Sequence, residues 1–170
     1  MTATTSADQV LTAELRSRID HWLAKFPDTP EGRQSTVIPA LHAVQDANGG
    51  YLERRHVEAV ADYIGMARAT AFEVATFYSM FDLDHPVGRH KVNICTNICC
   101  WLNGAEDLVR YTEEKLGVGL GETTGDGRVT LVREEECLAA CTGAPMMIVD
   151  GHYHTNLTRE RIDEILDALQ

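Results

Sequence analysis

The sequence has no long hydrophobic run, no excess of positive charge and no recognisable export signal. No stretch approaches the roughly 20 apolar residues that cross a bilayer. Its 15 basic residues are outnumbered by 26 acidic ones, and the formal net charge of −11 argues against nucleic acid or an anionic membrane surface as a partner. Residues 1–6 lack the basic and apolar regions of a secretory signal. We therefore expect a cytoplasmic protein without direct membrane contact.

The cysteines are few in number and unevenly placed. All five cysteines of the 170 residues fall in two short stretches, His90–Cys100 and Glu136–Cys141. No two of them are separated by the two residues of a thioredoxin-type redox pair, which argues against that chemistry. An odd number of clustered cysteines without an export signal favours metal binding in a reducing compartment over disulfides.

The first half of the chain shows helical periodicity and no strand pattern before residue 89. Apolar residues recur at spacings of three and four, which predicts amphipathic helices. Asp8 or Thr12 can cap the first helix, and Pro27 and Pro30 can end it. We expect residues 1–84 to form a helical bundle. The predicted helices are Val10–Phe26, Ile38–Gln45, Arg55–Ile64 and Thr70–Phe81.

The last of these helices carries a run of aromatic residues between Phe72 and Phe81. Such a run is usually part of a core, and the alternative is a surface that packs on a neighbouring domain or subunit. Because this half of the chain has no cysteine, we expect it to serve as a docking arm.

The second half mixes strand and helix signals after a polar break at Asp82–Gly88. The predicted order is strand, helix, strand, strand, strand, helix, with Asp150-Gly151 as a hairpin turn. This order predicts a thioredoxin-like α/β domain over residues 85–170, and the whole chain is expected to be α+β. The predicted elements are Lys91–Ile94, Ala105–Leu116, Arg128–Arg133, Met146–Val149, His152–His154 and a closing helix that starts at Thr158.

The spacing of the cysteines indicates the kind of site. Four residues separate Cys95 from Cys100, and three separate Cys137 from Cys141. Each pair follows a strand pattern, so thiolates on two strand-end loops can converge on an iron–sulfur cluster or a zinc ion. Structural zinc usually uses tighter pairs, so the spacing favours a two-iron cluster. Zinc and buried, unligated cysteines stay open as alternatives.

Two neighbouring cysteines compete for one ligand position in the first loop. Cys99 and Cys100 both follow Cys95 at a usable distance, but adjacent side chains diverge. Cys99 follows Ile98, and we expect it to be buried as a small apolar residue. No histidine is paired with a cysteine loop, so a mixed histidine–cysteine site is not expected.

The chain resembles the family of the small 2Fe–2S subunit of bacterial NADH:quinone oxidoreductase, which is respiratory complex I. The resemblance covers about residue 20 to the end. The motifs that carry it are Val92–Gly104, Lys115–Gly117, Gly121–Thr124, Glu136–Met146, Ile38–His42, Gly49–Tyr51 and Ala75–Phe81.

The resemblance implies an electron-transfer subunit with one 2Fe–2S cluster in a thioredoxin-like domain. Carried over position by position, the implied ligands are Cys95, Cys100, Cys137 and Cys141. One departure is Ala139, where the family commonly has glycine, and a methyl group is tolerated there unless the backbone needs a positive φ.

The resemblance also implies that the chain works within an assembly. FMN and NADH would bind to a partner subunit, other peripheral-arm subunits would lie nearby, and the complex would sit on the cytoplasmic side of a bacterial inner membrane. Catalysis would belong to this assembly, because the chain has no Gly-rich dinucleotide fingerprint and no nucleophile–base pair.

Two rivals remain at this point. One is the equivalent subunit of a soluble NAD-linked hydrogenase or formate dehydrogenase, and the other is a zinc-stabilised interaction module. The acidic run Glu134–Glu136 beside Cys137 is expected to lower the reduction potential of a cluster, since it adds negative charge near an anionic centre. The alternative is that at least two of these three side chains belong to a fully solvated face without such an effect.

Overall fold

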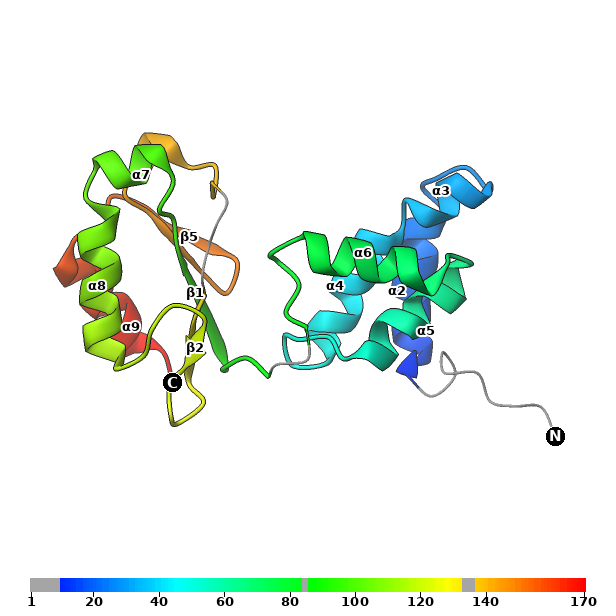
Figure 1. The fold of residues 1–170 in the computed structure, drawn as a ribbon, viewed down its shortest axis with the longest axis horizontal. Coiled ribbons are helices and arrows are strands. Elements are labelled where there is room, and N and C mark those ends of the chain that lie inside the picture. The colour runs from blue at the N-terminus through cyan, green and yellow to red at the C-terminus, as the bar shows by residue number, and fades with distance from the viewer. Residues whose placement is uncertain (1–9, 84–85, 133–136) are drawn as a thin grey trace. The chain divides into compact units, whose positions relative to one another are not determined.

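The chain forms two compact units, which divide between Pro86 and Val87. This computed structural model describes residues 10–83, 86–132 and 137–170. The first unit is built of helices, and the second has a mixed five-stranded sheet, so the expected α+β class is confirmed (Figure 1). Over the described residues, no helix combines the length and the apolar character needed to cross a bilayer.

The first unit packs its helices around one apolar core, which includes Ile19, Leu41, Leu52 and Ile64. Four of its helices lie where the periodicity predicts helices, with shifted ends. The helices are α2 (Ala13–Leu23), α3 (Pro30–Gln34), α4 (Val37–Ala47), α5 (Arg54–Ile64) and α6 (Arg68–Phe77).

The first predicted helix is shorter than expected, and a second short helix follows it. The Thr12 side chain accepts a hydrogen bond from the backbone N–H of Leu15 and so caps α2, whereas Asp8 lies outside the described residues. Pro30 starts α3 rather than merely ending α2. The Thr29 hydroxyl caps this helix by accepting from Gly32 N at 3.1 Å, and proline fits such a first position because it has no N–H to satisfy.

Helix α6 ends at Phe77 and not at Phe81, because the chain turns back onto α4. The Gln45 side chain donates to Met80 O at 3.0 Å and accepts from Asp82 N at 3.0 Å. This turn buries Phe81, while Phe77 stays 75% exposed. The aromatic run is therefore divided between the core and the surface.

The second unit contains a sheet with the strand order β2-β3-β1-β4-β5. Strands β1 and β3 are parallel, and the other neighbours are antiparallel. Strand β2 was not predicted, since two residues are too few to show an alternating pattern. The strands are β1 (His90–Ile94), β2 (Glu122–Thr123), β3 (Val129–Val132), β4 (Met147–Val149) and β5 (His152–His154).

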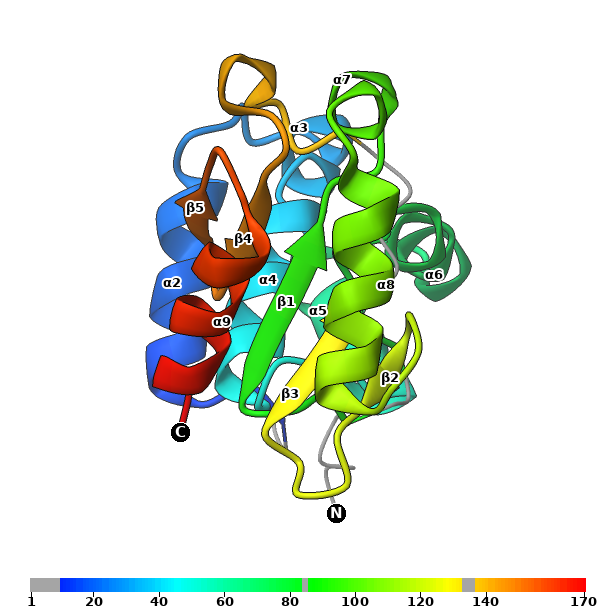
Figure 2. The ribbon, with the colours of Figure 1, turned by 90° about the vertical axis from the view of Figure 1, so that its left-hand side faces the viewer.

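Helices α8 (Ala105–Leu116) and α9 (Arg159–Ala168) lie side by side against one face of this sheet (Figure 2). The Tyr111 hydroxyl donates to Asp163 at 2.7 Å, and Lys115 forms ion pairs with Asp163 and Asp167. Beneath them, alternate residues of the central strands, such as Val92 and Leu131, form a second core. This packing holds the carboxyl end of β1 in place, and the first cysteine loop begins there.

The predicted hairpin turn between β4 and β5 is confirmed. Asp150 and Gly151 have φ values of 48° and 81°. Two positive φ values in a two-residue loop match the twist of the flanking strands. The Asp150 carboxylate also accepts from Lys91 N at 2.8 Å, which ties the turn to the start of β1.

Candidate metal centre

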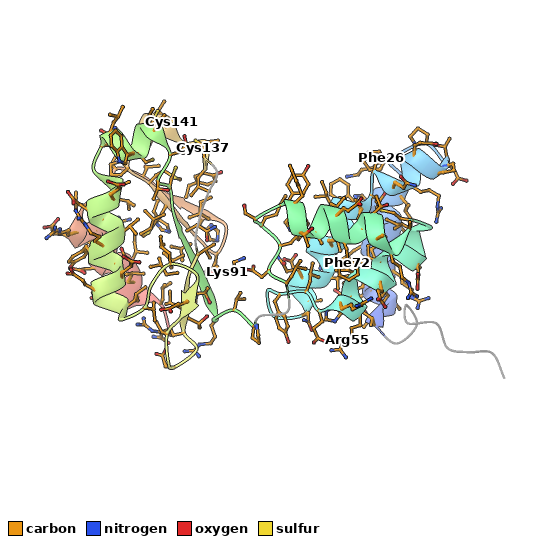
Figure 3. The ribbon with its side chains drawn as sticks, in the orientation of Figure 1. Phe26, Arg55, Phe72, Lys91, Cys137 and Cys141 are labelled. Carbon is orange, nitrogen blue, oxygen red and sulfur yellow. The ribbon has the colours of Figure 1, made fainter. Side chains whose placement is uncertain are left out.

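The two cysteine loops lie at the same end of the second unit. Cys95 directly follows β1, and the short helix α7 (Ile98–Leu102) carries Cys99 and Cys100. Cys141 starts a 3-10 turn (η1, Cys141–Gly143) that leads to β4. Figure 3 shows Cys137 and Cys141 together at the end of the unit that carries α7.

The first loop supplies buried sulfur atoms and the second supplies exposed ones. Cys95 and Cys100 are each 1% exposed and share a small core with Ala105 and Met146. Leu138 and Ala140 of the second loop pack against this core, so the two loops are in contact. Cys137 and Cys141 are exposed.

The second-loop sulfur atoms have the separation expected for two ligands of one metal. Cys137 Sγ and Cys141 Sγ are 3.7 Å apart. Two thiolates on one tetrahedral metal with bonds of about 2.3 Å lie about 3.8 Å apart. Cys137 also interacts with Cys95, and Cys100 interacts with Cys95. The four sulfur atoms therefore form a connected group made of two pairs.

The thiols shift one another's pKa values. Burial raises the pKa of Cys100 to about 11, and the hydrogen bond with Cys95 adds to this, while a backbone hydrogen bond from Met146 opposes it. Hydrogen bonds with Cys137 and then Cys99 raise the pKa of Cys141 to about 11. A backbone N–H lowers the pKa of Cys137, since Ala139 N donates to its sulfur at 3.4 Å. Such N–H groups favour the thiolate and stabilise an anionic centre.

The donor to Cys137 sits at a strained backbone position. Ala139 has a φ of 60°, in the left-handed region that favours glycine. A methyl group was expected to be tolerated there unless the backbone needs a positive φ, and the loop does need one. The methyl group is accommodated at a cost in backbone energy.

The expected burial of Cys99 is wrong. Cys99 is half-buried, and the preceding Ile98 is 66% exposed. Helix α7 turns Cys100 toward the core and leaves Cys99 outside it. The expectation failed because a five-residue helix was not anticipated there, and its geometry directs adjacent side chains about 100° apart.

Exposed apolar residues beside the site were also missed. Trp101 is 51% exposed and Leu102 is 71% exposed, and both belong to α7 with Ile98. No signal in the sequence distinguishes them from core residues, because a five-residue helix is too short to show a periodicity. The acidic run Glu134–Glu136 lies outside the described residues.

Among residues 10–83, 86–132 and 137–170, no three His, Cys, Asp or Glu side chains are grouped to hold a single metal ion. The sulfur atoms are arranged in pairs instead. The profile of the thioredoxin-like [2Fe-2S] ferredoxins matches residues 19–170. The chain belongs to this family. In a 2Fe–2S cluster each iron takes two cysteine thiolates, so two pairs of cysteines fit it.

Several proteins similar to this chain are named as NADH-quinone oxidoreductase or NADH dehydrogenase components. An NADH-quinone oxidoreductase subunit of Rickettsia conorii is 42% identical over 148 residues, which cover 87% of this chain and 86% of the relative. The mitochondrial NADH dehydrogenase [ubiquinone] flavoprotein 2 of Dictyostelium discoideum is 38% identical and covers 94% of this chain, with 63% of the relative aligned.

A solved structure shares the fold. An NAD+-reducing [NiFe]-hydrogenase aligns with a TM-score of 0.62 and 17% identity, over 77% of this chain and 22% of the hydrogenase chain. At this identity the likeness concerns the fold. The family match decides against the zinc module and supports a 2Fe–2S cluster as the cofactor.

Proposed function

We propose that this chain is the 2Fe–2S electron-transfer subunit of an NADH:quinone oxidoreductase, with Cys95, Cys100, Cys137 and Cys141 as ligands. The observation that supports the ligand set most strongly is the 3.7 Å separation of the Cys137 and Cys141 sulfur atoms within the second loop, which is the separation of two thiolates on one metal. The bound cluster supplies one-electron transfer. The chain's own residues hold it, shield one side of it and supply N–H donors to its sulfur ligands.

Two of the proposed ligands are buried and two are exposed, so the two sides of the centre differ in access to solvent. The Cys95 and Cys100 side is covered by Met146 and Ala105, and the Cys137 and Cys141 side is open. Electrons would pass through the open side, where a partner's redox group can approach. The exposed apolar residues of α7 flank this site and would be covered by that partner.

The proposed partner is the subunit that binds FMN and NADH, with other peripheral-arm subunits close by. The assembly would lie on the cytoplasmic side of a bacterial inner membrane. Relatives that are named as NADH-quinone oxidoreductase subunits, and that are similar over most of their length, support this assignment. A soluble NAD-linked hydrogenase or formate dehydrogenase is the second candidate, and only the fold of the hydrogenase supports it.

The experiment is to isolate the tagged chain from its native cells and identify what accompanies it. We expect an FMN-containing, NADH-oxidising subunit together with other subunits of a quinone reductase. Adding NADH should then produce the electron paramagnetic resonance (EPR) signal of a reduced 2Fe–2S cluster. Recovery with hydrogenase or formate dehydrogenase subunits would favour the second candidate, and recovery without a flavoprotein would refute both.

Serine variants of the first loop test which of its three cysteines bind the cluster. Cys95→Ser and Cys100→Ser should each lose or distort the cluster, because each removes a buried thiolate. Cys99→Ser is the matched control and should keep iron content and spectrum. If Cys99→Ser bleaches the protein while Cys100→Ser stays coloured, the assignment is wrong by one residue.

A further inference from the structure

The helical unit has a cavity of about 440 Å³ that is lined by residues of α2, α4 and α5. Leu15 and Val44, both buried, form its apolar wall, and the exposed Glu14, Arg18 and Asp46 form its polar edge. Cavities of this size hold small ligands, and a few placed polar groups orient the ligand. The proposed cluster ligands all belong to the other unit, so this cavity is a separate feature.

His56 lines this cavity and is only 5% exposed. Its Nδ1 accepts a hydrogen bond from Glu53 N at 3.0 Å, so the proton of the neutral ring is on Nε2. Burial lowers the pKa of His56, the Glu53 carboxylate opposes this shift, and the Arg55 cation adds to it. The ring is therefore neutral near pH 7 and has one N–H to donate.

The Nε2–H group of His56 has no acceptor within the described part of the chain, yet it is not sealed inside the core. Within residues 10–83, 86–132 and 137–170, the Thr36 hydroxyl is the one fully enclosed side-chain polar atom without a partner. The Nε2 atom of His56 therefore reaches open space, and the cavity is a space that His56 borders. Leaving a buried donor unpaired costs free energy, so a ligand that accepts from it gains affinity.

Asn48 follows α4 and offers the complementary group. Its Nδ2 donates to Tyr51 O at 3.0 Å, which leaves Oδ1 as an acceptor on a residue that lines the cavity. A donor and an acceptor together suit a carboxamide, whose carbonyl oxygen and N–H groups lie side by side.

The charges of the lining residues argue against an anionic ligand. Among the described lining residues, the carboxylates Glu14 and Asp46 outnumber the guanidinium Arg18. Arg18 is already paired, with its Nη2 at 3.2 Å from Asp46 Oδ2. An anion is therefore repelled by Glu14 and finds no unpaired cation at this edge.

We propose that this cavity binds an uncharged carboxamide attached to an apolar body. The carboxamide oxygen accepts from His56 Nε2–H, and the carboxamide N–H donates to Asn48 Oδ1. The apolar body lies against Leu15 and Val44. The binding is non-covalent and involves no electron transfer, so it does not depend on the proposed cluster ligands.

Three probes of the same shape test the ligand class: uncharged benzamide, anionic benzoate and cationic benzamidine. Their binding to the cluster-loaded full chain is measured by saturation-transfer NMR. We expect benzamide to bind with a Kd of about 1–10 mM, which suits so small a molecule. Benzoate should bind about tenfold more weakly because of the carboxylates at the edge. Benzamidine should also bind about tenfold more weakly, because it has no acceptor for His56 Nε2–H.

Four variants test the site itself. His56→Asn keeps an acceptor for Glu53 N but removes the donor, so it should weaken benzamide binding about tenfold. His56→Gln keeps an N–H of similar reach and should bind benzamide more tightly than His56→Asn does. Ala47→Trp adds a large ring at an exposed position of the cavity lining and should block binding. Ala24→Trp is the matched control, because Ala24 is also exposed at a helix end but does not line the cavity.

Equal binding of benzamide to the wild type, His56→Asn and Ala47→Trp would overturn the site, and so would a failure of benzamide to bind the wild type. Tighter binding of benzoate or benzamidine than of benzamide, with loss of that binding in Ala47→Trp, would overturn the assigned ligand class. If His56→Asn does not fold, the comparison of Ala47→Trp with Ala24→Trp decides, because neither changes the hydrogen bond between Glu53 and His56.

Discussion

At the scale of single residues, the site depends on backbone positions as much as on sulfur. Ala139 has a φ of 60° and still donates its N–H to Cys137 Sγ. A non-glycine residue in this region costs about 1–2 kcal/mol. Glycine avoids this steric cost, but the gain is only partial because glycine loses more conformational entropy on folding. The chain therefore accepts strain next to the proposed ligand Cys137 to keep an N–H directed at its sulfur.

Ala139→Gly should raise the free energy of unfolding by up to about 1 kcal/mol, because it relieves the strain at this position. Denaturant unfolding of the cluster-loaded protein measures the change. Ala140→Gly is the control, since Ala140 has a φ of −120° and no such strain to relieve. A loss of stability in Ala139→Gly would contradict the account of this loop.

His90 links three parts of the second unit and should make its stability depend on pH. Its Nδ1 lies 2.6 Å from Asp150 Oδ2 and its Nε2 lies 2.9 Å from Gln170 O. Only the protonated ring can donate from both nitrogens. The hydrogen bond to Asp150, followed by that to Gln170, raises the pKa of His90 above 6.5.

A raised pKa in the folded state adds stability below the unfolded value of 6.5, and this contribution is lost as the pH rises through the folded value. The difference in unfolding free energy between the wild type and His90→Gln should therefore shrink from about pH 6 to pH 8. Asp150→Asn keeps the turn and should flatten the pH dependence in the same way. A constant difference across this range would show that His90 does not titrate as described.

At the scale of elements, the second cysteine loop is held in place by the segment between β5 and α9. Asn156 N donates to Gly143 O at 2.7 Å, and Leu157 N donates to Pro145 O at 2.9 Å. A Cβ on Gly143 would lie 2.5 Å from the Cβ of Thr155, closer than such atoms approach. The loop that carries Cys141 is therefore packed directly against the rest of the domain.

Gly143→Ala should displace this loop, lower the thermal midpoint and weaken retention of the cluster. Gly125→Ala is the matched control, because a Cβ there meets no atom within 4 Å. Iron release to a chelator, followed over time, measures retention. Equal release from the two variants would refute the role of this contact.

The elements also show what a sequence can and cannot predict. The helix Ala105–Leu116 has three turns of periodicity and was predicted with its observed ends. Helices α3 and α7 have five residues each, and strand β2 has two, so no repeat reveals them. The cysteine spacing predicted a paired site, but the direction of Cys99 depends on the short helix α7, and the strain at Ala139 depends on how the second loop turns its N–H toward Cys137.

At the scale of the whole molecule, the two units have separate apolar cores. The first is built around residues such as Ile19 and Leu41, and the second around residues such as Val92 and Leu131. All five cysteines belong to the second unit. We propose that the first unit serves assembly and the second serves electron transfer.

Deleting residues 1–84 should leave a folded domain that keeps its cluster, because its core and all its cysteines remain. The same deletion should abolish binding to the flavin subunit. Iron content and co-purification with that subunit measure the two effects. Full retention of binding would show that the helical unit is not the docking arm.

Metal analysis of the purified full-length protein tests most directly whether this chain holds a 2Fe–2S cluster. Iron, zinc and acid-labile sulfide are measured together with visible absorption, under anaerobic conditions. We expect a brown-red protein with two irons and two sulfides per chain, as the family requires. A colourless protein with one zinc ion and no sulfide would contradict the account.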